Sequence, residues 1–267
     1  MPYLSPVLNV MVAAARKAGR GLIRDFGELE NLQVSLKGPA DFVSTADERT
    51  ERILIEELSR ARPGYAFLGE ESGVSDGPDK SHRFIIDPID GTTNFLHGIP
   101  IFAISIALER EGQLVSAVVY NPVVDEMYVA EKGHGAYLND KRLRVAARKT
   151  MKEALFATGA PFMGRPGHGR FLAELKAVLA ISPGIRRCGA ASLDMAGVAA
   201  GRYDGFWERG VNPWDVAAGI LLVREAGGIV SDLDGGDRML ETGELLATND
   251  VLYPQILKLL QNTPDQS

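Results

Sequence analysis

The sequence predicts an α/β protein, of the α+β type, whose two halves differ in how apolar runs and helical segments follow one another. In the first half, three apolar runs at residues 101–108, 114–120 and 126–130 are separated by the turn pairs Glu111-Gly112 and Asn121-Pro122. Short runs divided by turn residues are typical of antiparallel strands. After about residue 150, short apolar runs alternate with longer segments of helical periodicity. That alternation predicts a second sheet covered by helices.

Length and composition are those of a globular protein with a sizeable core. The 267 residues allow one domain over 1–267, with two sub-lobes at about 1–150 and 151–267. The net charge of −6 argues against a general nucleic-acid binder. No apolar run approaches the roughly 18 residues that span a bilayer. Cys188 is the only cysteine, which excludes an intrachain disulfide and favours a reducing, cytoplasmic location.

The first half is expected to open with two helices. Apolar residues recur at helical spacing in the first segment, at Leu8, Val12, Ala15, Gly19, Leu22 and Phe26. Residues 37–41 are expected to form a loop. A second helix is expected to begin near Thr45, with a capping box over residues 45–48, and to end before Pro63. Two short strands follow, at residues 66–68 and 84–86, and each ends at acidic residues.

The second half is expected to alternate strands and helices. The expected strands lie at residues 154–158, 184–187, 203–207, 228–231 and 245–247. The expected helices lie at residues 168–180, 192–200, 213–226 and 251–261.

The run DPIDGTT at residues 87–93 is the most informative part of the sequence. A buried strand ends in Asp87 and Asp90, and Pro88 between them predicts a sharp turn. Carboxylates crowded at one strand end need a compensating charge, and Mg²⁺ usually binds one or two carboxylates together with phosphate oxygens. Gly91 and the following threonines form a turn that can hold an anion at a helix start. The run therefore predicts metal-assisted phosphate chemistry.

Each candidate acid also has a structural explanation. Asp-Pro and Asp-Gly are common turn dipeptides. Asp215 follows Asn212-Pro213 and Asp47 lies in a first helical turn, so either aspartate is explained by the helix dipole alone. Glu70 is explained as a loop charge, and Glu208 as a surface residue paired with Arg209.

Several motifs together resemble those of the inositol monophosphatase family, the magnesium-dependent, lithium-sensitive phosphatases. They are DFVSTAD at 41–47, GEE at 69–71, DPIDGTT at 87–93, GAASLD at 189–194, AGRYDG at 200–205 and WDVAAG at 214–219. Their order and spacing match from about Lys37 to Gly228. The resemblance implies a layered α-β-α-β-α sandwich and a homodimer. It also implies hydrolysis of inositol monophosphate by metal-activated water, with two or three Mg²⁺ ions per site.

The resemblance also assigns roles to individual residues. The metal ligands would be Glu70, Asp87, Asp90, Asp215 and the backbone carbonyl of Ile89. The water would be oriented or deprotonated by Glu70, Thr92 and Asp47. The substrate contacts would be Asp90, Gly91, Thr92, Thr93, Gly189, Ala190, Ala191, Glu208 and Asp215.

The resemblance leaves other functions open. Fructose-1,6-bisphosphatase, histidinol-phosphatase and 3′-phosphoadenosine or NADP phosphatase activities occur on the same scaffold, although no aromatic cluster in the sequence identifies an adenine pocket. A function of another class is a binding factor in transcription antitermination or ribosome assembly. The complete set of carboxylates favours hydrolysis over a purely binding role.

Overall fold

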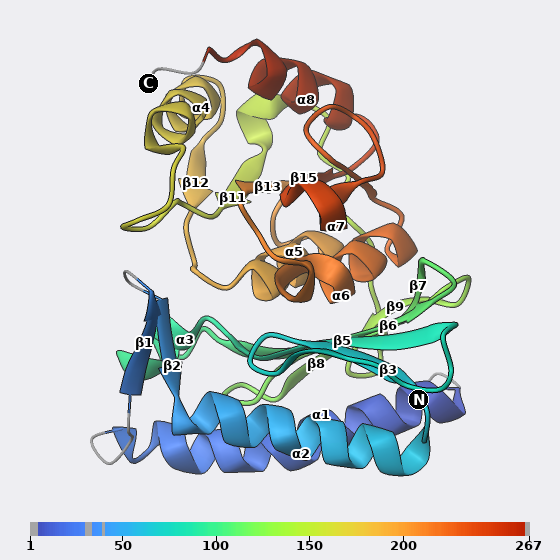
Figure 1. The fold of residues 1–267 in the computed structure, drawn as a ribbon. Coiled ribbons are helices and arrows are strands. Elements are labelled where there is room, and N and C mark those ends of the chain that lie inside the picture. Colours follow the sequence, from blue (N-terminus) through green and yellow to red (C-terminus); the bar gives the residue numbers. More distant parts are fainter. Residues whose placement is uncertain (1–4, 30–33, 39–40, 265–267) are drawn as a thin grey trace.

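The computed structural model describes residues 5–29, 34–38 and 41–264, with only the backbone given for residues 34–38 and 41–43. The described elements stack in five layers (Figure 1). Helices α1 (Pro6–Phe26) and α2 (Thr45–Ala61) cover the outer face of a larger sheet. Helices α5 (Ala191–Ala199) and α6 (Pro213–Glu225) lie between this sheet and a smaller one, and α4 (His168–Leu179) and α8 (Tyr253–Asn262) cover the far face. The predicted α-β-α-β-α sandwich is therefore confirmed.

The helices agree closely with the periodicity of the sequence. They are α1 (Pro6–Phe26), α2 (Thr45–Ala61), α3 (Thr92–Leu96), α4 (His168–Leu179), the 3-10 helix η2 (Met151–Glu153), α5 (Ala191–Ala199), α6 (Pro213–Glu225), α7 (Met239–Thr242) and α8 (Tyr253–Asn262). The short helices η2 and α7 were not predicted, whereas α3 begins at the helix start that was expected at residues 91–93. None of the described helices is both long and apolar enough to cross a bilayer.

Among the described residues, the larger sheet has the strand order β10-β9-β8-β7-β6-β5-β3-β4. Its strands are β3 (Ala66–Gly69), β4 (Gly73–Ser75), β5 (His82–Asp90), β6 (Ala103–Arg110), β7 (Gln113–Asn121), β8 (Glu126–Glu131), β9 (Gly135–Leu138) and β10 (Lys141–Arg142). Strands β6 to β8 form the predicted antiparallel meander, and β5 pairs antiparallel with β6 at its edge. The strands β4, β9 and β10 were not predicted.

The smaller sheet has the order β12-β11-β13-β15-β14 among the described residues. Its strands are β11 (Leu155–Thr158), β12 (Gly184–Arg186), β13 (Gly205–Arg209), β14 (Ile229–Ser231) and β15 (Glu244–Thr248). Strand β11 pairs in parallel with β12 and β13, whereas β15 pairs antiparallel with β13 and β14. This sheet is the α/β half that the alternating pattern predicted.

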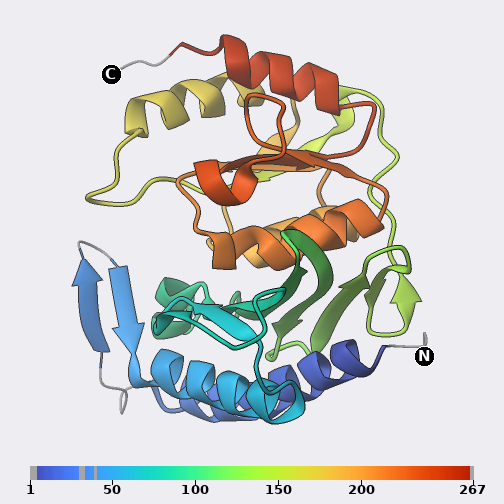
Figure 2. The ribbon, with the colours of Figure 1, turned by 45° about the vertical axis from the view of Figure 1, so that its right-hand side comes forward.

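A separate hairpin of β1 (Val34–Gly38) and β2 (Asp41–Ser44) leads into α2. Figure 2 shows it rising from the start of this helix. The loop predicted at residues 37–41 is therefore wrong at Lys37, Gly38 and Asp41, while residues 39–40 lie outside the described part. The capping box of α2 also lies one residue earlier than predicted, because Ser44 is the N-cap and its amide donates to Asp47 Oδ2 at 2.8 Å.

The central helices connect the two sheets. Residues of α6 from Val216 to Val223 are buried all round, as expected for a helix covered on both sides. One continuous apolar cluster joins these helices to Ile85 of the larger sheet and Phe206 of the smaller sheet. We propose on this ground that the two predicted sub-lobes form one domain.

Helices α5 and α6 approach so closely that Gly219 has no room for a side chain. A Cβ at this position would lie 2.6 Å from Cβ of Met195 on α5. We therefore expect Gly219→Ala to lower the free energy of unfolding by about 1–3 kcal/mol, as overpacked cores do. The measurement is the midpoint of urea unfolding, monitored by signals from each of the two sub-lobes.

Gly21→Ala on α1 is the matched control. A Cβ there would have only Arg49 Nε nearby, at 4.0 Å. Helix propensity alone should then raise the stability by up to about 1 kcal/mol. Two separate transitions in the Gly219→Ala protein would contradict the single domain.

Candidate active site

The strand β5 carries the two aspartates into the interior instead of ending before them. It pairs with β6 at Asp87↔Ser105 and again at Asp90↔Ala103, with a register shift between the two pairs. Such a shift is a β-bulge, where Pro88 is tolerated because a bulge leaves an amide position unpaired. The sharp turn predicted after residue 86 is therefore wrong. The bulge buries both carboxylates, since Asp87 is 1% exposed and Asp90 is 8% exposed.

Four predicted acids converge from three segments of the chain. Glu70 follows β3, Asp87 and Asp90 end β5, and Asp215 lies in the first turn of α6. Burial raises the pKa of Asp87 well above its usual range, and the charges of Glu70, Asp90 and Asp215 raise it further. Burial likewise raises the pKa of Asp215 well above its usual range, with Asp90 and Glu70 adding to it. The four side chains therefore share one electrostatic environment.

Hydrogen-bond donors of the protein hold three of these acids in place. Asp90 accepts from the Ala191 amide at 3.2 Å, the Ser192 amide at 2.7 Å and Ser192 Oγ at 2.5 Å. Even so, burial raises the pKa of Asp90 to about 6. Asp215 Oδ2 accepts from the Asn212 amide at 2.7 Å, and Asp87 Oδ1 accepts from the Ile89 amide at 2.9 Å. Asp215 thus caps its helix and also belongs to the acidic cluster.

The turn that carries Glu70 is held by Glu51, which sequence reasoning missed. Glu51 on α2 is 2% exposed and accepts from the amides of Glu71 at 2.9 Å and Ser72 at 2.8 Å. A Cβ on Gly69 would lie 2.6 Å from Glu51 Oε2, so a side chain at residue 69 would displace the Glu51 carboxylate. No local pattern signals this contact, because the partners lie 20 residues apart.

The predicted pair of Thr92 and Asp47 is brought together. Thr92 Oγ1 lies 3.1 Å from Asp47 Oδ1 and 3.0 Å from the carbonyl oxygen of Ile89. The other carboxylate oxygen of Asp47 accepts from Ser44 Oγ at 2.6 Å. The hydroxyl proton of Thr92 therefore faces two acceptors, and the lone pairs of its oxygen remain available to a further donor.

The two predicted substrate-binding turns lie against each other. Gly91 has φ +94°, and a Cβ there would lie 2.9 Å from the Ile101 carbonyl and 3.3 Å from Cβ of Ala190. Only glycine fits this position without strain. Asn94 Nδ2 stabilises the other turn, residues 189–191, by donating a hydrogen bond to the carbonyl oxygen of the preceding residue, Cys188, at 2.9 Å. Gly91 thereby adjoins the turn of residues 189–191, while Thr93 on α3 is exposed.

Glu208 on β13 is half-buried and faces the same cluster. Burial raises its pKa to about 8, and the charges of Asp194 and Asp90 contribute. Arg209 forms its ion pairs with Glu174 and Glu244, so the predicted alternative of a Glu208–Arg209 surface pair does not hold. Asp194, which sequence reasoning missed, is 2% exposed, and burial raises its pKa to about 8.

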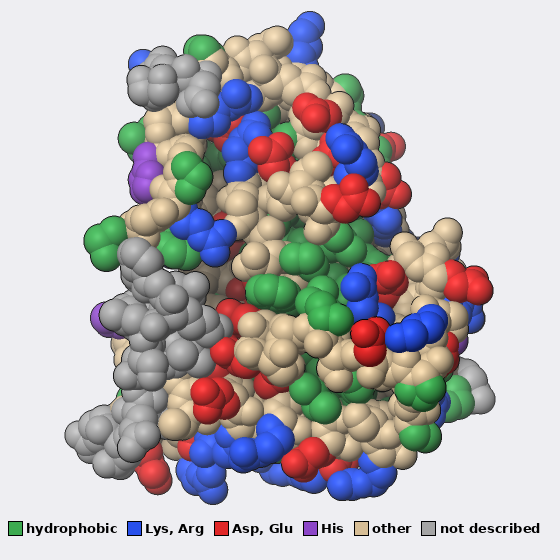
Figure 3. All heavy atoms as spheres, in the orientation of Figure 1, with side chains coloured by type: hydrophobic (Ala, Val, Ile, Leu, Met, Phe, Trp, Pro, Cys, Tyr) green, Lys and Arg blue, Asp and Glu red, His purple; other side chains and the backbone are tan. Residues whose placement is uncertain are grey.

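The donor set suits a hard cation. All the candidate ligands are oxygens, and the neighbouring acids repel one another, which a divalent ion would relieve. The carbonyl oxygen of Ile89 accepts one hydrogen bond and keeps a second lone pair. Within the described part of the chain, however, no three His, Cys, Asp or Glu side chains already have the arrangement of a metal-binding cluster. Figure 3 shows acidic side chains gathered on one face along the junction of the two halves.

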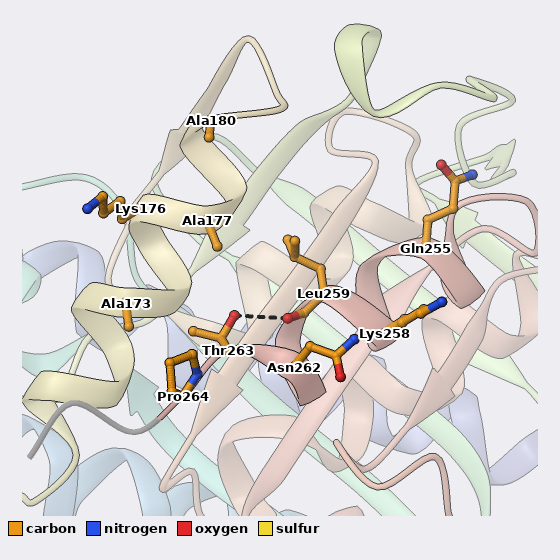
Figure 4. A pocket seen from close by; sticks show the side chains of 10 residues that line it. All are labelled: Ala173, Lys176, Ala177, Ala180, Gln255, Lys258, Leu259, Asn262, Thr263 and Pro264. Carbon is orange, nitrogen blue, oxygen red and sulfur yellow. Dashed lines mark hydrogen bonds between the residues drawn. The ribbon is translucent and has the colours of Figure 1, made fainter.

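A groove of about 570 Å³ lies away from the carboxylate cluster, between α4 and α8 (Figure 4). Its lining includes Ala173 and Ala177 on α4, Leu259 on α8, and the lysines Lys176 and Lys258, but no acid or histidine. It holds none of the groups that phosphate hydrolysis needs. The carboxylate cluster, not this groove, is the candidate active site.

Comparisons with known proteins show the family that the motifs resemble. Residues 3–265 match the sequence profile described as the Inositol monophosphatase family. The inositol-1-monophosphatase of Mesorhizobium japonicum is 59% identical over 257 residues, covering 96% of this chain and 97% of the relative. The Nus factor SuhB of Pseudomonas aeruginosa is 44% identical over 262 residues, covering 97% of each chain. The crystal structure of the extragenic suppressor protein suhB from Bartonella henselae superposes with a TM-score of 0.95 at 55% identity, covering 97% of this chain and 100% of that one.

Glu51→Gln should destabilise the turn that carries Glu70. A glutamine side chain has only one acceptor oxygen. Its NH₂ group would therefore face one of the two backbone N–H groups that now donate to Glu51. A buried unsatisfied group costs about 1–3 kcal/mol, and we expect a loss of this size in the free energy of unfolding. Glu56→Gln, the same change on the exposed face of α2, is the control and should have no effect. Equal stabilities of the two variants would show that the Glu51 contacts do not hold the turn.

Proposed function

Because this chain belongs to the inositol monophosphatase family, we propose that it is a metal-dependent phosphomonoesterase that hydrolyses inositol monophosphate to inositol and phosphate. The family and the phosphatase class predicted from the sequence are confirmed. The observation that carries the proposal is the convergence of four acids from three segments, three of them desolvated, beside the turn of residues 91–93. Identity of 59% to a relative named inositol-1-monophosphatase supports this substrate.

We propose Mg²⁺ as the cofactor, in two or three ions per site. Its ligands would be Glu70, Asp87, Asp90, Asp215 and the carbonyl oxygen of Ile89. When bound, such ions activate water, stabilise the leaving oxygen and neutralise phosphate charge. The protein contributes fixed carboxylates whose mutual repulsion favours a cation in their midst.

Thr92 and Asp47 would accept the proton of the attacking water. The hydroxyl of Thr92 donates toward Asp47, so its oxygen can take a hydrogen bond from water and pass the proton on to the carboxylate. Ser44 holds the other oxygen of Asp47 and fixes its orientation. Glu70 would orient the same water. Positioning of this kind needs no covalent intermediate with the protein.

The remaining contacts would bind phosphate and the leaving group. Gly91, Thr92 and Thr93 would bind phosphate oxygens, and Asp90 and Asp215 would touch the substrate together with the metals. The residues Gly189, Ala190 and Ala191 and the carboxylate of Glu208 would contact the inositol hydroxyls. The amide of Ala191 donates to Asp90, so this residue would act through its turn and not through its N–H.

The other predicted functions receive less support. The relative named Nus factor SuhB is 44% identical, below the 59% of the relative named inositol-1-monophosphatase. A role in transcription or ribosome assembly is therefore not favoured. A homodimer, sensitivity to Li⁺ and a cytoplasmic location stay predictions that rest on the family resemblance and the composition.

A panel of substrates tests the proposal. With Mg²⁺, inositol 1-phosphate should be hydrolysed faster than fructose 1,6-bisphosphate, histidinol phosphate and 3′-phosphoadenosine 5′-phosphate. Chelation should abolish the activity, added Mg²⁺ should restore it, and Li⁺ should inhibit it. Full activity after exhaustive chelation, with no metal retained, would contradict the mechanism. A preference for another member of the panel would overturn the substrate alone.

Asp90→Asn should lower kcat at least about a hundredfold, because the cluster loses a charge that holds the metals. The fold should survive, since the amide is nearly the same shape and can still accept from Ser192. Asp140→Asn, on the exposed turn between β9 and β10, is the matched control and should keep normal kcat. Near-normal turnover of Asp90→Asn would mean that Asp90 only shapes the bulge.

Above pH 8, where Glu208 is ionised, Glu208→Gln should weaken hydrolysis of inositol 1-phosphate by about ten- to a hundredfold, because charged acceptors make the stronger hydrogen bonds to hydroxyls. An aryl phosphate such as p-nitrophenyl phosphate lacks those hydroxyls and should be hydrolysed nearly as before. The measurement is kcat/KM for both substrates. Equal losses would place Glu208 among the metal or water contacts, and no loss on either would remove it from the site.

A further inference from the structure

The strand β13 presents its residues alternately to two different layers. Phe206 packs in the cluster of α5 and α6, whereas Trp207 packs in the cluster of the outer helices α4 and α8. Successive side chains of a strand point to opposite faces. Glu208 therefore shares the inner face with Phe206, toward the acidic cluster, and Arg209 shares the outer face with Trp207.

The outer face of β13 is held by a single buried side chain, Glu174 of α4. Glu174 is 1% exposed and accepts from Arg209 Nε at 3.0 Å and Arg209 Nη2 at 2.9 Å. It also accepts from Trp207 Nε1 at 3.3 Å. The two residues that flank Glu208 in the chain thus bind one carboxylate. This arrangement fixes the rotation of β13 about its axis at residue 208.

The network around Glu174 is closed and balanced in charge. Arg170 donates to Glu174 at 2.9 Å, and Arg209 Nη1 donates to Glu244 Oε1 at 2.6 Å. Two arginines therefore match two glutamates. A buried acid with this many donors is held firmly, whereas a partly paired one would leave a buried charge uncompensated.

Gly159 limits Glu208 from the other side. Strand β11 ends at Thr158, opposite Trp207, and the hydroxyl of Thr158 donates to the carbonyl oxygen of Trp207 at 2.8 Å. The next residue, Gly159, lies so close that a Cβ built on it would overlap the carboxyl group of Glu208. The carboxyl group also borders a cavity of only about 40 Å³, lined in part by Gly159 and Phe171. Its position therefore depends on the absence of a side chain at residue 159.

Glu208 needs such restraint because it stands near two other acids. The charges of Asp194 and Asp90 act against its ionised form. A free glutamate side chain would turn away from them and toward solvent. Restraint from the backbone and from Gly159 keeps it where a leaving group can meet it.

We infer that Glu174 and Gly159 are positioning residues that fix the Glu208 carboxylate and thereby set which leaving group the enzyme accepts. The inference rests on the proposed role of Glu208 toward inositol hydroxyls. Neither residue needs to touch the substrate. Their effect should fall on substrates with a polyol leaving group and leave the hydrolytic chemistry unchanged.

The test compares kcat/KM for inositol 1-phosphate with kcat/KM for p-nitrophenyl phosphate in the full-length Mg²⁺-loaded enzyme. Glu174→Gln removes the charge that binds Arg209, and Gly159→Ala adds a methyl group against the carboxyl end of Glu208. We expect each variant to lower the ratio of the two values about five- to tenfold. Gly159→Ala should fold, because the atoms that must give way are the end of a flexible side chain.

A purely structural role would leave the ratio unchanged, since a smaller folded fraction lowers both activities alike. Val178→Ala is the matched control: this residue is fully buried on α4, one turn from Glu174, and its apolar side chain forms none of the hydrogen bonds that Glu174 forms with Trp207 and Arg209. It should lower the urea midpoint and keep the ratio of the wild type. A shift of the ratio in Val178→Ala would overturn the inference.

Glu208→Gln, alone and combined with Glu174→Gln, separates the inference from the proposed function. If Glu174 acts through Glu208, the double variant should have the ratio of Glu208→Gln alone, because coupled residues are not additive. Additive losses would mean that Glu174 acts by another route and would overturn the inference. A shift in Glu208→Gln without one in either Glu174→Gln or Gly159→Ala would also overturn it and leave the proposed function standing. No shift in Glu208→Gln would overturn the role of Glu208 and the inference with it.

Discussion

The gathering of like charges in a desolvated place is the constraint on which this structure depends. Glu70, Asp87, Asp90 and Asp215 come from three segments, and burial combined with mutual repulsion raises the pKa of Asp87 and Asp215 well above the usual range. Repulsion of this kind would push flexible segments apart. The chain opposes it by placing each acid on a rigid element: a bulged central strand, a strand end and the first turn of a helix that is buried on all sides. The layered fold is thus the frame that lets the acids stay together.

Two kinds of buried acid therefore occur in this molecule, and their partners distinguish them. Glu51 and Glu174 have donors on both oxygens, from backbone amides in one case and from Arg209, Arg170 and Trp207 in the other. They hold neighbouring segments in place. Asp87 and Glu208 have fewer hydrogen-bond donors, and their neighbours are other acids. A carboxylate in such surroundings is suited to bind a cation or a substrate hydroxyl. The first kind fixes the geometry in which the second kind can act.

Local pattern was enough to predict most of the fold. Periodicity located α1, α6 and the meander, because amphipathic spacing and turn pairs are properties of short segments. It failed where tertiary pairing decides: Lys37, Gly38 and Asp41 looked like parts of a loop but belong to a hairpin. Asp87-Pro88 looked like a turn but forms a bulge held by β6. Thr45 and Ser44 are both good N-caps, so the sequence placed that cap one residue late.

Residues that act at a distance in the chain could not be found in this way. Ser192 donates to Asp90 across 102 residues, and Arg209 binds Glu174 across 35. Neither pair has a fixed spacing in sequence that would signal it. The family resemblance supplied the roles of Glu70 and Asp215 where residue chemistry left them open, because it compares whole motifs in order. The resemblance did not identify the distant residues that hold those motifs in place.

The site also divides between the two sheets in a way that links its geometry to helix packing. The larger sheet supplies Glu70, Asp87 and Asp90, whereas Glu208 stands on the smaller sheet. The packing of the middle layer therefore sets how the candidate metal ligands lie relative to the leaving-group contact. Gly219 against Met195 sets how closely α5 and α6 pack within that layer, and Ser105 Oγ, which donates to the carbonyl oxygen of Trp214 at 3.3 Å, ties the start of α6 to β6. Because packed interiors resist deformation, these contacts hold phosphate chemistry and leaving-group recognition at a constant distance.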